Sequence, residues 1–276
     1  MSKRLAVLGH PVGHSRSPAM QNAALAELGL GEEWSYEAID VAPDAFEVRV
    51  RAMLGEGFVG ANVTVPHKGA ALALADDLSE ASREIGAVNT LLFADGEIRA
   101  ENTDADGLLR SLPGPPSGMR ALVLGAGGAA RAVVWALLRE GATVEVWNRT
   151  ESRSRDLCVE LGGQPASSPD QASYDLIVNS TAVGLRGESP FGELPLGAAD
   201  FRPGQVVLDM VYGGEPTDLL RAAARGGATA VDGIEVLVQQ GALSLELWTG
   251  RPAPLDTMRA AARAAQTEAD GPKSEL

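Results

Sequence analysis

The chain has 276 residues, a formal net charge of −14 at pH 7, and hydrophobic and charged fractions of 45% and 22%. The length predicts two domains, and the composition is that of an ordinary globular protein. The acidic balance argues against a nucleic-acid-binding role, because phosphate contacts need clustered lysine and arginine. The single cysteine, Cys158, is expected in the core, and it excludes intramolecular disulfides and cysteine-based zinc sites; no bound metal is expected. Without a signal peptide or an apolar run of transmembrane length, the sequence predicts a cytoplasmic protein with no membrane partner.

The first part of the chain alternates between strand-like and helix-like segments. Strands are predicted at 5–8, 34–39 and 62–65, and helices at 18–28, 43–54 and 69–78. Alternation of this kind favours a mostly parallel sheet covered by helices. A further strand-like segment, 87–91, is followed by a turn at Asp95-Gly96 and then by the segment 101–104.

A polar loop follows the first strand and contains two serines. If this loop is extended, Ser15 and Ser17 project to the same side, with Arg16 opposite. Ser17-Pro18 is also a typical helix start, with serine as the N-cap and proline at the first helical position. A cap alone would account for Ser17 but would leave Ser15 unexplained.

The segment Asn62–Lys68 carries the clearest indication of chemistry. Its first four residues alternate, with Val63 and Val65 on one strand face and Asn62 and Thr64 on the other, until Pro66 stops the strand. The chain has three lysines against 20 arginines, and Lys68 is the one that lies away from the termini. Lysine can release its proton whereas arginine cannot, so this lysine at a helix start indicates proton transfer. The alternative is that arginine use reflects genome composition and that Lys68 is merely solvated.

Two further polar residues, Asn89 and Asp104, lie where a strand meets a loop or a helix. In open α/β sheets the ligand crevice lies beyond the carboxyl ends of strands, so such residues are candidates for a site. The alternative is that each is a turn former or a helix cap, and Asp104 has the sequence of a cap.

A boundary and a glycine-rich turn come next. Residues 111–118 contain three prolines and two glycines and are typical of an exposed linker. The following strand, 121–124, leads through Gly125–Ala130 into an amphipathic helix at 129–139 and a second strand at 143–147. This context predicts a dinucleotide site, because glycines allow a tight turn and let a pyrophosphate approach the helix N-terminus.

The second strand of this unit ends in Asn148-Arg149-Thr150, and Arg153 follows one short turn later. An NAD site usually carries an acidic residue here to hold the ribose 2′-hydroxyl. An arginine pair instead suits a 2′-phosphate, which predicts NADP as the cofactor. The alternative is an exposed helix start with solvated arginines.

The alternation continues to the end of the chain. Strands are predicted at 174–178, 206–208 and 229–231, and helices at 217–224, around 238–241 and at 255–265. Two βαβ-like halves therefore fit within 119–233. The polar residues 267–276 are expected to form a disordered tail.

Taken together, in order and spacing, these motifs resemble the shikimate dehydrogenase family over nearly the whole chain. The segments that carry the resemblance are Ser15–Pro18, Asn62–Lys68, Gly86–Thr90, Asn102–Gly107, Gly125–Ala130, Asn148–Thr150, Asp209–Tyr212 and Leu237–Gln240. The resemblance implies two α/β domains: an open-sheet substrate domain at 1–112, a Rossmann-like NADP domain at 119–233, and C-terminal helices at 234–266 that return to the substrate domain. It also implies reversible reduction of 3-dehydroshikimate to shikimate with NADP in the shikimate pathway, by a monomer or homodimer.

At matching positions, Ser15 and Ser17 are implied to bind the substrate carboxylate, and Lys68, paired with Asp104, to bind substrate and carry the proton. Substrate ring hydroxyls are implied to be held by Thr64, Asn89, Asp104, Tyr212 and Gln240. Cofactor contacts are implied for Gly125, Ala126, Gly127, Gly128 and Ala129 at the pyrophosphate, for Asn148, Arg149, Thr150 and Arg153 at the adenosine phosphate, and for Met210 and Gly233 at the nicotinamide. Glu80 matches a position that faces the cofactor in some relatives, without support from its own sequence context.

Two other interpretations stay open. One is a dual quinate/shikimate dehydrogenase; such relatives tend to differ at the second serine and at the arginine pair, so Ser17, Arg149 and Arg153 weigh against it. The other is a non-catalytic NADP-binding regulator, which would keep the glycine turn but would not need Lys68 and Asp104 together.

Overall fold

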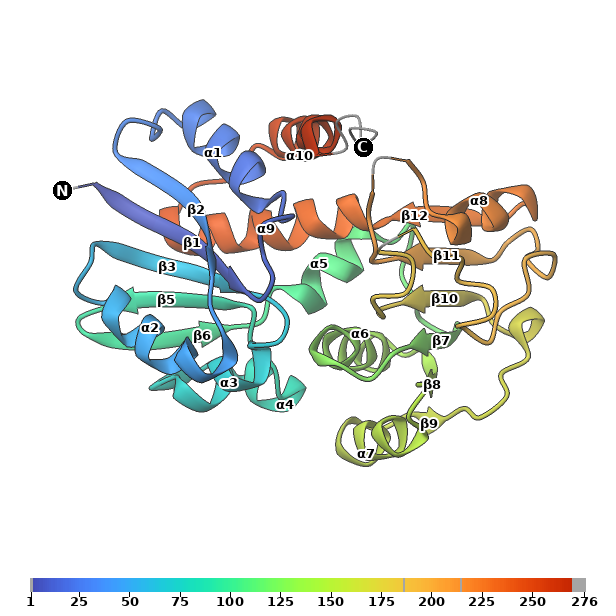
Figure 1. The fold of residues 1–276 in the computed structure, drawn as a ribbon. Helices are drawn as coiled ribbons and strands as arrows, with labels where there is room; N and C mark the ends of the chain where they lie inside the picture. The colour runs from blue at the N-terminus through green and yellow to red at the C-terminus, as the bar shows by residue number, and fades with distance from the viewer. Residues whose placement is uncertain (1, 186, 214, 270–276) are drawn as a thin grey trace, which may run out of the picture. The chain divides into compact units, whose positions relative to one another are not determined.

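The computed structural model describes residues 2–185, 187–213 and 215–269, which form two compact units, each with its own six-stranded sheet (Figure 1). Unit 1 comprises the chain up to Gly107 together with the chain from Leu237 onward, and unit 2 comprises Leu108–Val236. The expected two-domain α/β architecture is confirmed. In the described residues, no helix combines the length and apolarity needed to cross a membrane.

The sheet of unit 1 has the strand order β2-β1-β3-β5-β6-β4. Its strands are β1 (Lys3–Gly9), β2 (Trp34–Asp40), β3 (Phe58–Val63), β4 (Asp77–Leu78), β5 (Thr90–Ala94) and β6 (Glu97–Glu101). As expected, β1 pairs in parallel with β2 and β3. The other half is mixed, because β5 runs antiparallel to β3 and β6 around the Asp95-Gly96 turn.

Helices cover both faces of this sheet (Figure 1). They are α1 (Ser17–Glu27), α2 (Phe46–Met53) after the short 3-10 turn η1 (Pro43–Ala45), α3 (Lys68–Leu74), α4 (Glu80–Ile85), α10 (Leu255–Ala269), and parts of α5 (Asp104–Ser111) and α9 (Gly233–Thr249). Phe46, Val50 and Met53 of α2 belong to the core on one face. On the other face, Gln21 of α1 donates a hydrogen bond to the carbonyl of Gly241 in α9 at 2.9 Å.

Three predicted elements of unit 1 are wrong in extent, and the first is the strand-like segment 87–91, because strand β5 begins only at Thr90 and runs to Ala94. The strand predicted at 62–65 ends at Val63, because the chain turns there with a hydrogen bond from the amide of His67 to the carbonyl of Thr64 at 2.9 Å. Val65 is consequently 67% exposed instead of sharing a buried face with Val63. The helix predicted to reach Leu78 ends at Leu74, because residues 77–78 pair with β6.

Unit 2 is a fully parallel sheet in the order β12-β11-β10-β7-β8-β9. Its strands are β7 (Arg120–Leu124), β8 (Thr143–Trp147), β9 (Gln164–Pro165), β10 (Leu176–Asn179), β11 (Val206–Asp209) and β12 (Thr229–Asp232). Its helices are α6 (Gly128–Arg139), α7 (Glu151–Leu161) and α8 (Asp218–Arg225), with a 3-10 turn η2 (Gln171–Ser173). Every residue of β10 and β11 is buried, as strands covered on both faces should be. Cys158 of α7 is buried, as expected.

The limits of the two compact units differ in detail from the domain limits expected from the sequence. The change of unit after Gly107 falls inside α5, and the change after Val236 falls inside α9. Helix α10 continues to Ala269, three residues into the expected tail, and residues 270–276 lie outside the described part of the chain.

Candidate active site

Lys68 and Asp104 form an ion pair in unit 1, each at the first position of a helix. Their side chains are only 12% and 9% exposed, so the pair is largely withdrawn from solvent. Lys68 follows the turn after β3, and Asp104 follows the short segment after β6. A buried ion pair needs further hydrogen bonds to offset the cost of removing both charges from water.

Asn89 supplies one of those hydrogen bonds. Its Nδ2 donates to Oδ1 of Asp104 at 2.9 Å, while the other oxygen of Asp104 faces Lys68. The same Nδ2 lies 3.2 Å from Oε1 of Gln240 on α9. Four residues predicted for the site, Lys68, Asn89, Asp104 and Gln240, therefore lie in one hydrogen-bonded network.

The interpretation of Asp104 as a helix cap is wrong, because Asn102 has that role. Oδ1 of Asn102 accepts hydrogen bonds from the amides of Asp104 and Ala105 at 3.0 and 3.2 Å. The carboxylate of Asp104 is thereby left available to Lys68 and Asn89.

The hydroxyl of Ser17 does not cap α1 either. Ser17 is the first helical residue, and Arg16, which occupies the cap position, makes no side-chain cap hydrogen bond. The buried Ser17 instead hydrogen-bonds Tyr36; burial raises the pKa of Tyr36 well above its usual value, and this hydrogen bond offsets part of the rise. Oγ of the half-buried Ser15 accepts from the amide of Ser17 at 3.3 Å.

A set of buried polar side chains that sequence reasoning did not assign to the site connects these groups. Tyr36 donates to Oδ1 of Asn62 at 2.7 Å, and Nδ2 of Asn62 donates to Oγ of Ser244 at 2.9 Å. Oδ1 of Asn89 accepts from the amide of Thr103 at 2.7 Å and from the hydroxyl of Thr90 at 3.1 Å. A signal for Ser244 existed, since it lies four residues after Gln240 on the same helix face.

Three further candidates lie on three different segments: Thr64 and Tyr212, implied to bind substrate, and Glu80, matched to a cofactor-facing position. Thr64 is half-buried in the turn after β3, where its amide donates to the carbonyl of Leu8 at 2.9 Å. Tyr212 follows β11 and belongs to unit 2. Glu80 is the exposed first residue of α4 in unit 1.

The predicted glycine turn joins β7 to α6 in unit 2. Gly125 has a φ of +113°, and a Cβ there would lie 2.8 Å from Oγ of Ser180, so this position requires glycine. Gly127 precedes the first helical residue, Gly128, and a Cβ on Gly127 would meet nothing within 4 Å. The start of α6 is therefore open on the side of Gly127, with Ala126 and Ala129 half-buried beside it.

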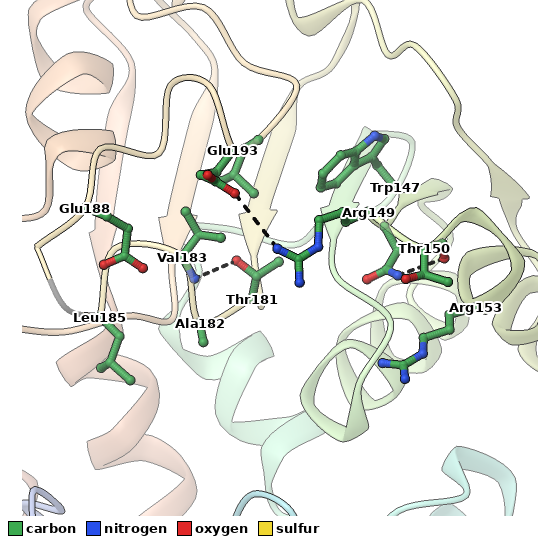
Figure 2. A pocket seen from close by; sticks show the side chains of 12 residues that line it. Trp147, Arg149, Thr150, Arg153, Thr181, Ala182, Val183, Leu185, Glu188 and Glu193 are labelled. Atoms are coloured by element: carbon green, nitrogen blue, oxygen red, sulfur yellow. Dashed lines mark hydrogen bonds and ion pairs between the residues drawn. The ribbon is translucent and has the colours of Figure 1, made fainter.

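A cavity of about 510 Å³ lies beside the ends of β8 and β10 (Figure 2). It is lined by Trp147, Asn148, Arg149, Thr150, Arg153, Thr181, Ala182, Val183, Leu185, Glu188, Glu193 and Leu194. All four residues predicted for the adenosine phosphate line it. Arg149 is 84% exposed, and its Nη1 lies 4.0 Å from Oε2 of Glu193.

Asp209 supports the loops around the carboxyl ends of β10 and β11. Its carboxylate accepts from Nδ2 of Asn179 at 2.9 Å, from the amide of Val211 at 3.1 Å and from Oγ1 of Thr217 at 2.7 Å. Burial raises the pKa of Asp209 to about 6, although these hydrogen bonds favour the charged form.

The two residues predicted for the nicotinamide end lie beside these loops. A Cβ on Gly233 would lie 2.7 Å from the carbonyls of Asp209 and Met210. The fold therefore holds Gly233 close against Met210. Across the described ranges, no group of three or more His, Cys, Asp or Glu side chains is arranged to hold a metal ion.

The chain combines two α/β units. One has an open sheet and a largely buried Lys–Asp pair, and the other has a parallel sheet, a glycine turn and a cavity lined by arginines. These features define a two-domain dinucleotide-binding α/β protein. The family models described as shikimate dehydrogenase substrate binding domain, shikimate / quinate 5-dehydrogenase and shikimate 5'-dehydrogenase C-terminal domain match residues 7–91, 110–183 and 233–263.

Similar proteins cover nearly the whole chain. The shikimate dehydrogenases (NADP(+)) of Anaeromyxobacter dehalogenans and Methanopyrus kandleri are 45% and 43% identical, over 90% of this chain and 91% of each relative. The crystal structure of shikimate 5-dehydrogenase from Thermus thermophilus, in complex with NADP(H) and shikimate, has a TM-score of 0.87 and 43% identity, covering 96% of this chain and 100% of that one. The chain belongs to the shikimate dehydrogenase family.

Proposed function

We propose that this protein is an NADP-dependent shikimate dehydrogenase, which reversibly reduces 3-dehydroshikimate to shikimate in the biosynthesis of chorismate and the aromatic amino acids. The observation that carries this proposal is the Lys68–Asp104 pair held by Asn89 in a chain of this family. A regulator that only bound ligand would have no need for a withdrawn pair of opposite charges at the substrate side.

The cavity in unit 2 fits NADP by the chemistry of its donors. Arg149 and Arg153 offer guanidinium groups suited to a 2′-phosphate, and the described end of β8 has no acidic residue for a ribose 2′-hydroxyl. Gly125–Ala129 would hold the pyrophosphate at the start of α6, with Asn148 and Thr150 beside the adenosine phosphate. Met210 and Gly233 would border the nicotinamide. When bound, NADPH would supply the hydride, and NADP would accept it in the reverse direction.

The substrate would be held mainly by unit 1. Ser15 and Ser17 offer hydroxyl donors to the carboxylate, and hydrogen bonds to a charged group are the strong ones. The ring hydroxyls would be held by Thr64, Lys68, Asn89, Asp104, Gln240 and, from unit 2, Tyr212.

Lys68 would move the proton. As the carbonyl carbon of 3-dehydroshikimate is reduced, its oxygen becomes an alkoxide that needs a proton and a nearby positive charge. The ammonium of Lys68 supplies both, and in the reverse direction its neutral amine takes the hydroxyl proton. Asp104 would orient Lys68, and Asn89 would fix Asp104 through its 2.9 Å hydrogen bond.

We further propose that the protein has no nucleic-acid partner, given its net charge of −14. We also propose that it works as a monomer or homodimer. Location in the cytoplasm stays a prediction from the sequence.

Replacing Lys68 tests the proposed mechanism. Lys68→Arg keeps the positive charge but removes the ability to shuttle a proton, so kcat should fall by about 10²–10⁴-fold. Lys68→Met, similar in length and uncharged, controls for crowding by the guanidinium and should lose at least as much. NADPH binding, measured by fluorescence, should stay intact in both variants, because its proposed pocket lies in unit 2. A Lys68→Arg enzyme within a fewfold of wild-type kcat would rule out proton transfer by Lys68.

A further inference from the structure

The cavity in unit 2 carries charges of both signs. Its lining includes two arginines, Arg149 and Arg153, and two glutamates, Glu188 and Glu193. The arginines come from the end of β8 and the start of α7, whereas the glutamates come from the connection between β10 and β11. A pocket that only had to attract a phosphate would gain nothing from carboxylates in its wall.

The two arginines differ in their surroundings. Figure 2 shows Glu193 directed toward Arg149, and the closest approach is 4.0 Å between Oε2 and Nη1. Arg153 has no ion pair or side-chain hydrogen bond within the described residues. Of the two arginines, therefore, only Arg149 has a carboxylate within ion-pair distance in the described residues.

The backbone holds Glu193 at this place. The amides of Glu193 and Leu194 both donate to the carbonyl of Pro190, at 3.3 and 2.9 Å. Leu194 is only 4% exposed and belongs to the core of unit 2, and Phe191 pairs with it in a β-bridge. The carboxylate is thus presented to the cavity from a segment anchored in the core.

We propose that Glu193 is a determinant of cofactor specificity, acting as the counter-ion of Arg149 that the 2′-phosphate of NADP must displace. This inference rests on the proposed function, because it assumes that Arg149 receives that phosphate. Glu193 thereby lowers the preference of the protein for NADP over NAD, since NAD has no group that competes for Arg149. Glu193→Gln leaves the side-chain shape nearly unchanged and removes the competing charge.

The test uses two fragments that differ only in the phosphate, adenosine 2′,5′-bisphosphate and 5′-AMP, with binding measured by titration calorimetry. Glu193→Gln should bind the bisphosphate about two- to fivefold more tightly, the range expected for removal of an exposed ion pair, and should bind 5′-AMP as wild type does. The gain should shrink on going from about 0.01 M to 1 M salt, because salt screens exposed charges. Glu140→Gln, an exposed glutamate at the end of α6, controls for net charge and should show no gain.

Double variants identify the partner of Glu193. The gain from Glu193→Gln should fall to less than half in an Arg149→Ala background and persist in an Arg153→Ala background. An equal gain in both backgrounds, an equal gain in Glu140→Gln, or no gain at all would overturn the inference while leaving NADP as the cofactor. If wild type itself bound the bisphosphate no more tightly than 5′-AMP, both the inference and the NADP assignment would fail.

Discussion

At the scale of single residues, replacing Ser17 distinguishes a role in substrate binding from a role in folding. Its side chain makes no cap hydrogen bond and instead contacts Tyr36, which keeps a second partner in Asn62. Ser17→Ala should therefore destabilise the fold by no more than one hydrogen bond, about 0.5–1.5 kcal/mol. Loss of a donor to the carboxylate should raise the KM for shikimate roughly ten- to a hundredfold. A sharp drop in Tm with an unchanged KM for shikimate would mean that Ser17 is purely structural.

Asp209 gives a prediction about pH. Burial raises the pKa of its carboxyl from 3.8 to about 6, so the folded state binds this proton more tightly than the unfolded state. The stabilisation contributed by this proton is therefore greatest at low pH and is lost as the pH rises through about 6. Relative to Asp209→Asn, wild type should lose roughly 2 kcal/mol of unfolding free energy between about pH 4.5 and about pH 7. Urea unfolding of both proteins at the two pH values measures this, and a difference that stays constant or grows with pH would contradict it.

Single residues were predictable where the residue type itself was unusual. Lys68 is notable as the internal lysine of an arginine-rich chain, and the arginines after β8 replace the acidic residue of NAD sites. Tyr36 and Ser244 could not be found in this way, because their role depends on hydrogen bonds to Asn62 across 26 and 182 residues of sequence. For Ser244 the one local signal is its position four residues after Gln240 on the same helix face, and Tyr36 has no such signal.

At the scale of elements, the contact between α5 and α9 depends on one glycine. A Cβ on Gly107 would lie 2.7–2.8 Å from Cβ, Cα and the backbone nitrogen of Gln240. Gly107→Ala should therefore move Gln240 away from Asn89, raise the KM for shikimate, and destabilise the fold by about 1–3 kcal/mol through overpacking. Gly69→Ala is the matched control, because a Cβ on this residue of α3 would meet nothing within 4 Å. It should stabilise the helix by about 0.5–1 kcal/mol; equal behaviour of the two variants would contradict the close approach.

Most elements were predictable from periodicity, and the helix after Lys68 shows why the end of one was not. The β7–α6–β8 segment follows the prediction closely because strand, glycine turn and amphipathic helix each leave a local signal. The apolar run after Lys68 gave no such signal for its end at Leu74. There the amide of Asp76 donates to the carbonyl of Ile98 at 2.9 Å, and this tertiary pairing overrides the helical propensity.

At the scale of the whole molecule, no local sequence pattern predicted that the chain returns to unit 1 after unit 2. Gln21 and Gly241 are hydrogen-bonded across 220 residues, and Trp248 donates to the carbonyl of Leu91 at 2.9 Å. Only the resemblance to the family implied this discontinuous unit. The consequence is that Gln240, from the far end of the chain, completes the network around Asn89.

The most direct measurement is the initial rate of NADPH formation by the purified full-length protein, followed by absorbance, with shikimate and quinate side by side. NADP and NAD should be compared for each substrate. The protein should reduce NADP with shikimate, and it should do so faster than with quinate. Its kcat/KM should be roughly ten- to a hundredfold higher with NADP than with NAD, because a charge-assisted phosphate contact contributes about that factor. No NADP reduction with shikimate, or a faster rate with quinate, would contradict the assignment of this chain as an NADP-dependent shikimate dehydrogenase.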